Sequence, residues 1–128
     1  MKLQNIKYKA KRLDNGEWIY GSLIRSTAGI KKRAYIVDAF SSMCDYSVVG
    51  IEPSSICQFT GLTDSKGNEI WEGDIAECEI YDLYKGFIKV KAVIEYMYGA
   101  FVAIIDGMPY SLYFKYIKVI GNKFDKDK

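Results

Sequence analysis

The sequence contains no histidine. Histidine is the usual general base beside a serine or cysteine nucleophile, and it is the commonest metal ligand. Its absence therefore excludes Ser-His-Asp and Cys-His catalysis, together with any metal site built on imidazole. We expect no catalytic residue, no metal and no cofactor.

Cysteine and proline are also scarce, with three and two residues. Cys44, Cys57 and Cys78 are odd in number and lack C-x-x-C spacing, which disfavours a secreted disulfide scaffold. Buried structural thiols are favoured over a zinc site. The basic N-terminal segment has no apolar stretch behind it, unlike a signal peptide, and no apolar run reaches bilayer-spanning length. These features predict a cytoplasmic protein without a membrane partner.

No excess of charge points to one class of partner. The net charge of +2 is too small to demand nucleic acid, although a local basic patch would still permit it. The 128 residues are about the length of one domain, and 49% hydrophobic against 27% charged residues indicates a globular chain. Aromatic residues make up 15%, which favours strands, and eleven glycines suit tight turns.

Short alternating segments run through the N-terminal part. Residues 6–11 alternate apolar side chains with lysines, which predicts a strand with one face in water. The turn sequence Asp14-Asn15-Gly16 and a second apolar segment, 17–24, complete a β-hairpin. Further strands are expected at 34–39 and 46–51. After them, Ser54 or Ser55 could cap a single helical turn, and a plain turn fits the sequence equally well.

Closely spaced strand patterns continue to residue 122, and none has helical periodicity. Such spacing is typical of a small barrel or sandwich, and residues 70–122 have the size of an SH3-like barrel. We predict a mainly β protein with one domain over residues 1–125. An N-terminal β subregion, about 1–52, would pack on an SH3-like barrel, about 56–124, and residues 126–128 would be a frayed tail.

The central segment QFTGLTDSKGNEIWEGDI, Gln58 to Ile75, carries the one group of carboxylates with catalytic potential: Asp64, Glu69, Glu72 and Asp74. A turn interpretation is stronger. Asp64-Ser65-Lys66-Gly67 fits a type I turn, and Glu72-Gly73-Asp74 fits a second tight bend. No phosphate-loop spacing is present. Phe59, Leu62, Ile70 and Ile75 are expected in the core, with Trp71 left open.

Basic residues are grouped with aromatic ones at three places. Lys31, Lys32, Arg33 and Tyr35 form the candidate binding surface; Lys7, Lys9 and Lys11 follow one strand face; Tyr113, Lys115, Tyr116 and Lys118 lie near the end. Charge with exposed rings can bind single-stranded nucleic acid. Solvated lysines that protect strand edges are the alternative interpretation.

Residues 58–75 resemble the signature segment of the YopX family of phage and prophage proteins. IKYKAKRLDNGEWIYG, Ile6 to Gly21, resembles its opening hairpin, and IKVIGNKFD, Ile117 to Asp125, resembles its closing segment. Lys11-Arg12 departs from a frequent tryptophan-aspartate pair, and Cys57 stands where glycine is usual. The family-motif positions are expected to be structural turns: Gln58, Thr60, Gly61, Asp64, Gly67, Glu72, Gly73, Asp74, Gly121 and Asn122.

The resemblance implies a β-rich fold with an SH3-like barrel and a protein of the bacterial host cytoplasm. It transfers no catalytic residue. We expect a non-catalytic accessory protein that binds a host or phage protein and modulates host defence or replication. Homo-oligomer formation is plausible, because exposed strand edges and tyrosines favour self-association. The alternatives are a nucleic-acid-binding protein and a small-nucleotide binder or carboxylate enzyme.

Overall fold

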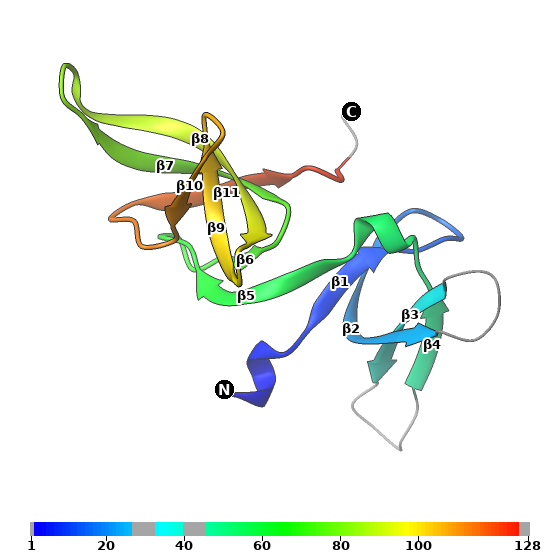
Figure 1. Cartoon of the computed structure of the whole chain (residues 1–128). Helices are drawn as coiled ribbons and strands as arrows, with labels where there is room; N and C mark the ends of the chain where they lie inside the picture. The colour runs from blue at the N-terminus through cyan, green and yellow to red at the C-terminus, as the bar shows by residue number, and fades with distance from the viewer. Residues whose placement is uncertain (1, 27–32, 40–45, 126–128) are drawn as a thin grey trace. The chain divides into compact units, whose positions relative to one another are not determined.

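The structure, a computed structural model, describes residues 2–26, 33–39 and 46–125. The predicted loop residues Lys31 and Lys32, Cys44 and the predicted tail at 126–128 lie outside the described residues. The chain divides into two compact units, residues 1–59 and 60–128. Figure 1 shows strands almost throughout the described parts of both units.

The first unit contains the 3₁₀ turn η1 (Leu3–Asn5), strands β1 (Tyr8–Lys11), β2 (Trp18–Ser26), β3 (Arg33–Ala39) and β4 (Tyr46–Gly50), and the 3₁₀ turn η2 (Pro53–Ser55). Strand β5 (Cys57–Thr63) crosses into the second unit, which continues with β6 (Glu69–Trp71), β7 (Asp74–Asp82), β8 (Gly86–Met97), β9 (Ala100–Ile105), β10 (Met108–Ser111) and β11 (Ile117–Asn122).

Two antiparallel sheets make up the described chain, with orders β4-β3-β2-β1-β5-β6 and β10-β9-β8-β7-β11. The prediction of a mainly β protein is therefore confirmed. The described residues contain no α-helix and form no closed barrel. None of their helical turns is long and apolar enough to cross a membrane.

The opening hairpin forms as predicted. Lys11 pairs with Trp18, and Gly16 adopts a left-handed φ of 71° at the turn. The Asn15 Oδ1 accepts the Glu17 N–H at 2.9 Å, which holds the loop. The predicted helical turn is η2, but neither serine caps it; Ser55 is buried, and its Oγ accepts the Lys11 N–H at 2.8 Å.

The core of the first unit consists of five apolar side chains on alternate positions of its strands and on the bridge residue that follows β4: Ala10, Ile19, Ala34, Ile36 and Ile51. The prediction that the lysine face of β1 lies in water is wrong for Lys9, which is only 7% exposed. The Nζ atoms of Lys9 and Lys11 lie 4.5 and 4.3 Å from the Trp18 ring centroid. The face of the indole attracts both ammonium groups, which accounts for a lysine packed against the sheet rather than in water.

The core of the second unit gathers small and branched side chains of its strands: Ile70, Ala76, Cys78, Ala92, Ile94, Ala103, Ile105 and Ile117. Of the expected core residues, Phe59 and Ile70 are buried, Trp71 is buried as well, and Ile75 is half-buried. The prediction that Leu62 lies in the core is wrong, because its side chain is 46% exposed. Cys57 and Cys78 are buried, and burial, with the charge of Glu77, raises the pKa of Cys78 to about 11.

Gly21 in β2 offers a direct test of the first sheet. A Cβ at this position would overlap the Val37 carbonyl oxygen on the neighbouring β3, a backbone atom that has little room to move. We expect Gly21→Ala to lower the free energy of unfolding by about 1–3 kcal/mol, as overpacking generally does. The urea midpoint measures the loss.

Gly121→Ala is the matched control, because it also lies in a strand but has open space around its Cα and no positive φ. Its stability should stay within about 0.5 kcal/mol of the parent. Equal effects of the two substitutions would contradict the packing of Gly21 against β3.

Candidate functional site

The family-motif segment begins at Gln58, half-buried in β5 opposite Tyr8, and continues along the strand through Thr60 and Gly61. The Thr60 hydroxyl donates to the Ile70 carbonyl at 2.7 Å and accepts the Leu62 N–H at 3.2 Å. Gly61 has a left-handed φ of 85°, and no other atom lies within 4 Å of the position that a Cβ would take there. The glycine is therefore required for its backbone angle and not for a close approach.

Asp64 is the centre of the first turn. Its backbone carbonyl accepts the Gly67 N–H at 3.0 Å, and its Oδ1 accepts the N–H groups of Lys66 and Asn68 at 2.9 and 2.8 Å. Gly67 completes the turn with a φ of 86°. One carboxylate oxygen thus satisfies the donors of the loop around it, as aspartate commonly does at the start of a turn.

The other Asp64 oxygen leaves the turn and binds the last strand. Oδ2 accepts the Val119 N–H of β11 at 2.9 Å, 55 residues further along the chain. Ser65 adds two bonds to the same strand, since its N–H donates to the Ile117 carbonyl at 2.8 Å and its Oγ accepts the Ile117 N–H at 3.0 Å. The central and closing segments of the family pattern are therefore joined in one hydrogen-bond network.

Asp74 makes a second buried connection of the same kind. Its Oδ2 accepts the Trp71 N–H at 2.7 Å, which closes the bend through Glu72 and Gly73, and its Oδ1 accepts the Asn122 side-chain amide at 3.0 Å. Gly73 has a φ of 85° and donates its N–H to the Ile94 carbonyl at 2.6 Å. The Asn122 Oδ1 in turn accepts the N–H of Phe124 at 2.9 Å, just beyond the end of β11.

The electrostatics of Asp64 follow from these bonds. Burial alone would raise the pKa of the carboxyl, but the N–H groups of Val119, Asn68 and Lys66 and the Asn68 amide outweigh burial and lower it. Asp64 therefore remains an acceptor with its oxygens committed to backbone donors. Such a carboxylate is poorly suited to exchanging a proton with a substrate.

Of the four carboxylates of the segment, only Asp64 lines one of the cavities found in the described residues. A small cavity of about 180 Å³ beside Leu62 and Tyr113 includes Asp64 among its lining residues, but not Glu69, Glu72 or Asp74. Within residues 2–26, 33–39 and 46–125, no group of three or more carboxylates or thiols is placed to hold a metal ion.

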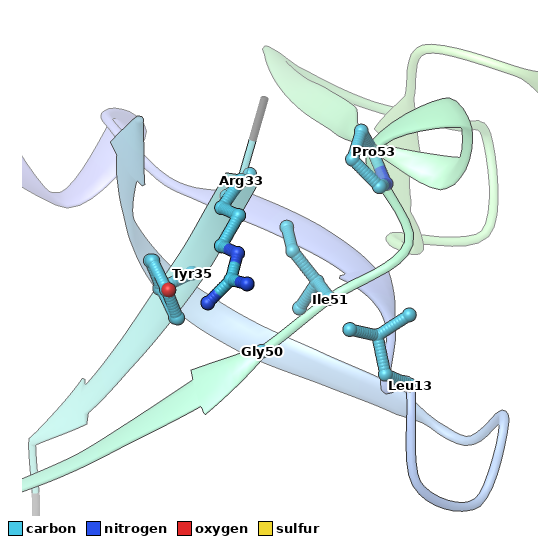
Figure 2. Close-up of a pocket in the computed structure, with 7 residues that line it drawn as sticks. Leu13, Arg33, Tyr35, Gly50, Ile51 and Pro53 are labelled. Carbon is cyan, nitrogen blue, oxygen red and sulfur yellow. The ribbon is translucent and has the colours of Figure 1, made fainter. Parts of the chain in front are cut away.

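A larger pocket of about 420 Å³ opens on the first unit. Its lining residues are Leu13, Arg33, Ala34, Tyr35, Gly50, Ile51 and Pro53. Arg33 and Tyr35 lie two positions apart on β3 and so project from one face of the sheet. Figure 2 shows these two side chains on one side of the pocket and Leu13, Ile51 and Pro53 on the other. The pocket combines an apolar floor, one guanidinium and one phenol.

Gly50 leaves the space that the pocket occupies. It pairs directly with Tyr35 across the β3–β4 ladder, and a Cβ at this position would lie 3.4 Å from a side-chain carbon of Leu13, another residue of the pocket lining. Ile51 is almost fully buried beneath, while Arg33 is exposed at the rim and Tyr35 is half-buried. The structure thus brings together two of the four predicted surface residues, Arg33 and Tyr35.

In the other basic–aromatic groups most rings contact lysines of the chain, whereas Tyr113 is 95% exposed. The Nζ atoms of Lys7, Lys9 and Lys11 lie over the rings of Phe59 and Trp18. Near the end of the chain, Tyr116 lies under Lys89 at 4.6 Å and donates to Glu77 at 3.4 Å. Rings covered by the protein's own cations are not open platforms for stacking bases.

The sequence patterns did not indicate an apolar groove on the second unit. A hollow of about 410 Å³ is lined by Thr60, Leu62, Phe101, Ser111, Leu112 and Tyr113. Two of these residues belong to the family-motif segment, for which the sequence predicts only turns and core anchors. The signal that could have revealed this hollow is the position of Leu62 directly after Gly61. The left-handed φ of 85° at Gly61 ends the alternation of buried and exposed positions along β5, so Leu62 need not point into the core.

The structure and a comparison with known families together identify the kind of protein and the family to which it belongs. The fold and the turn network define a β-sheet protein whose best-defined motif holds the backbone together. The sequence matches the family described as YopX protein over residues 7–127, so the chain belongs to the YopX family, as its motif segments predicted. No curated protein matches it significantly.

Asp64→Asn tests the network. An asparagine keeps one acceptor oxygen but turns an NH₂ group toward either Val119 or the turn amides, leaving a buried donor unpaired. We expect a loss of about 1–3 kcal/mol in the free energy of unfolding at pH 7. Asp82→Asn is the control, because Asp82 accepts the Tyr84 and Lys85 N–H groups in an exposed turn, and it should change stability by less than about 0.5 kcal/mol.

The pH dependence has a defined sign. Because the folded pKa of Asp64 lies below its unfolded value of about 3.9, its stabilisation is fully present above that value and is lost as the pH falls through the folded pKa. Urea midpoints between about pH 6 and pH 2 should therefore fall more steeply for the parent than for Asp64→Asn. Parallel curves would refute the role given to this carboxylate.

Proposed function

We propose that the protein is a non-catalytic phage or prophage accessory protein that binds a host or phage protein through the pocket of Arg33 and Tyr35. The proposed class of partner is a component of host defence or replication, met in the bacterial cytoplasm. Family membership supports the phage context, and the pocket is the single observation that carries the binding site.

The chemistry of the pocket selects the kind of contact. Its volume lies at the small end of the range for ligand sites, so it suits one side chain rather than a large cofactor. Leu13, Ile51 and Pro53 favour an apolar group, and Arg33 favours a carboxylate beside it through a planar pair of donors. A peptide segment with an apolar residue next to aspartate or glutamate meets both requirements.

The hydrogen bonding of the motif carboxylates supports a protein that acts without catalysis. Asp64 and Asp74 are buried acceptors of backbone and amide N–H groups, and such groups serve structure rather than acid–base exchange. For the second unit we propose an SH3-like strand arrangement that is open rather than closed into a barrel, supported by its five-stranded antiparallel sheet and family membership. Nucleic acid remains the alternative ligand, and the experiment below separates it.

A photo-crosslinking amino acid in place of Tyr35 tests the pocket in host lysate. We expect a protein adduct that Arg33→Glu reduces about tenfold or more and that Arg33→Lys reduces less, because lysine keeps the charge but loses the planar fork. The same crosslinker in place of Tyr98, exposed in the second unit, is the control and should give no adduct sensitive to Arg33. No adduct at position 35, or one removed by nuclease, would overturn the proposal.

A further inference from the structure

The outer end of the β7–β8 hairpin has no neighbouring strand in the part of the chain that the structure describes. The β11–β7 pairing extends as far as Cys78, with one further bond from the Glu79 N–H to the Tyr116 carbonyl at 3.2 Å, and β9 pairs with β8 only from Val93 onward. The β7–β8 ladder itself continues to Asp82 and Gly86, and Figure 1 shows it projecting from the other strands of its unit. We call residues 79–90 the arm. A two-stranded ribbon is only marginally stable alone in water.

The arm presents large apolar side chains to solvent. Leu83 and Tyr84 at its tip are 86% and 96% exposed, and Tyr81 and Phe87 are 63% and 66% exposed. Tyr81 and Phe87 are cross-strand partners in edge-to-face contact, with ring centroids 5.2 Å apart. Large apolar side chains exposed together on one element often mark a binding surface.

The tip is also held in place. Asp82 Oδ1 accepts the N–H groups of Tyr84 and Lys85 at 2.8 and 2.9 Å, which fixes the turn that carries the exposed side chains. A surface ordered before binding loses less conformational entropy when a partner covers it. The exposed rings are therefore presented in a defined arrangement.

Charged residues behind the aromatic pair form two columns on the same face. Glu77 and Glu79 lie on β7, and their direct cross-strand partners on β8 are Lys91 and Lys89. The columns are weakly paired with each other, since Lys89 Nζ reaches Glu77 diagonally at 4.0 Å between two half-exposed side chains. Tyr116 also contacts both columns, because its ring lies 4.6 Å from Lys89 Nζ and its hydroxyl donates to Glu77 at 3.4 Å. Lys118, opposite Glu77 on β11, lies outside these two columns.

An acidic column beside a basic column is complementary to itself. Rotation by 180° about an axis parallel to the strands, between β7 and β8, places the acidic column of one copy over the basic column of another. The same rotation places Tyr81 over Phe87. A partner carrying one sign of charge would instead face two like charges, which is unfavourable.

We propose that the arm is a dimerisation surface, and that its occupant is the arm of a second copy lying face to face with it and pointing the same way. Tyr81 of each copy contacts Phe87 of the other, and Glu79 faces Lys89 across the twofold axis. The interface is isologous, so it closes at two copies.

Sedimentation equilibrium of the full chain, with charge exchange, tests the proposal. Glu79→Lys places lysine against Lys89 of the second copy, and Lys89→Glu places glutamate against Glu79. Each variant alone should raise the dimer dissociation constant about tenfold or more. Mixing the two should restore wild-type affinity in a heterodimer, because every pair across the axis is then opposite in sign. The double variant should restore it within one chain.

Lys2→Glu, which changes the net charge as Lys89→Glu does but at an exposed site in the first unit, should leave the dissociation constant unchanged. Urea midpoints of each variant show that loss of dimer is not loss of folding. A wild-type chain that remains monomeric up to about 100 μM, far above the dissociation constant of a specific dimer, overturns the proposal. So does a mixture of the two single variants that fails to restore the dimer.

Discussion

The buried carboxylate of Asp64 is the contact on which the second unit depends. One oxygen satisfies the donors of its own turn, and the other accepts the Val119 N–H of β11. Leaving those donors unpaired inside the protein would cost more than an ordinary hydrogen bond contributes, so aspartate is required for geometry and charge together. Asp74 repeats the arrangement with Trp71 and Asn122. The central and closing segments of the family pattern thus act together to hold the backbone.

Local chemistry explains which features the sequence predicts well. Asp14-Asn15-Gly16 and the alternating strands depend on two or three neighbouring residues, and the opening hairpin and the mainly β class follow from them. The Asp-x-x-Gly pattern likewise indicates the turn at Asp64. Its bond to Val119 joins residues 55 positions apart, and no local pattern reports that.

The errors have equally specific causes. Alternation predicts that Lys9 lies in water, because a single strand does not show that Trp18 of the next strand will cover it. The apolar side chain of Leu62 predicts a core position, whereas the left-handed Gly61 before it ends the alternation. The Arg33 and Tyr35 pocket depends on Gly50, a cross-strand neighbour, and its floor comes from segments that only the fold brings together.

We propose that the family motif serves to hold the backbone together through Asp64 and Asp74. Native-state hydrogen exchange of the Val119 amide tests this most directly, because that N–H is donated to the Asp64 carboxylate. We predict that it exchanges only through global unfolding, with the same free energy and denaturant dependence as the core amides of β7. Exchange at the rate of an exposed loop, with β7 still protected, would contradict the claim and leave the Asp64 carboxylate available for another role.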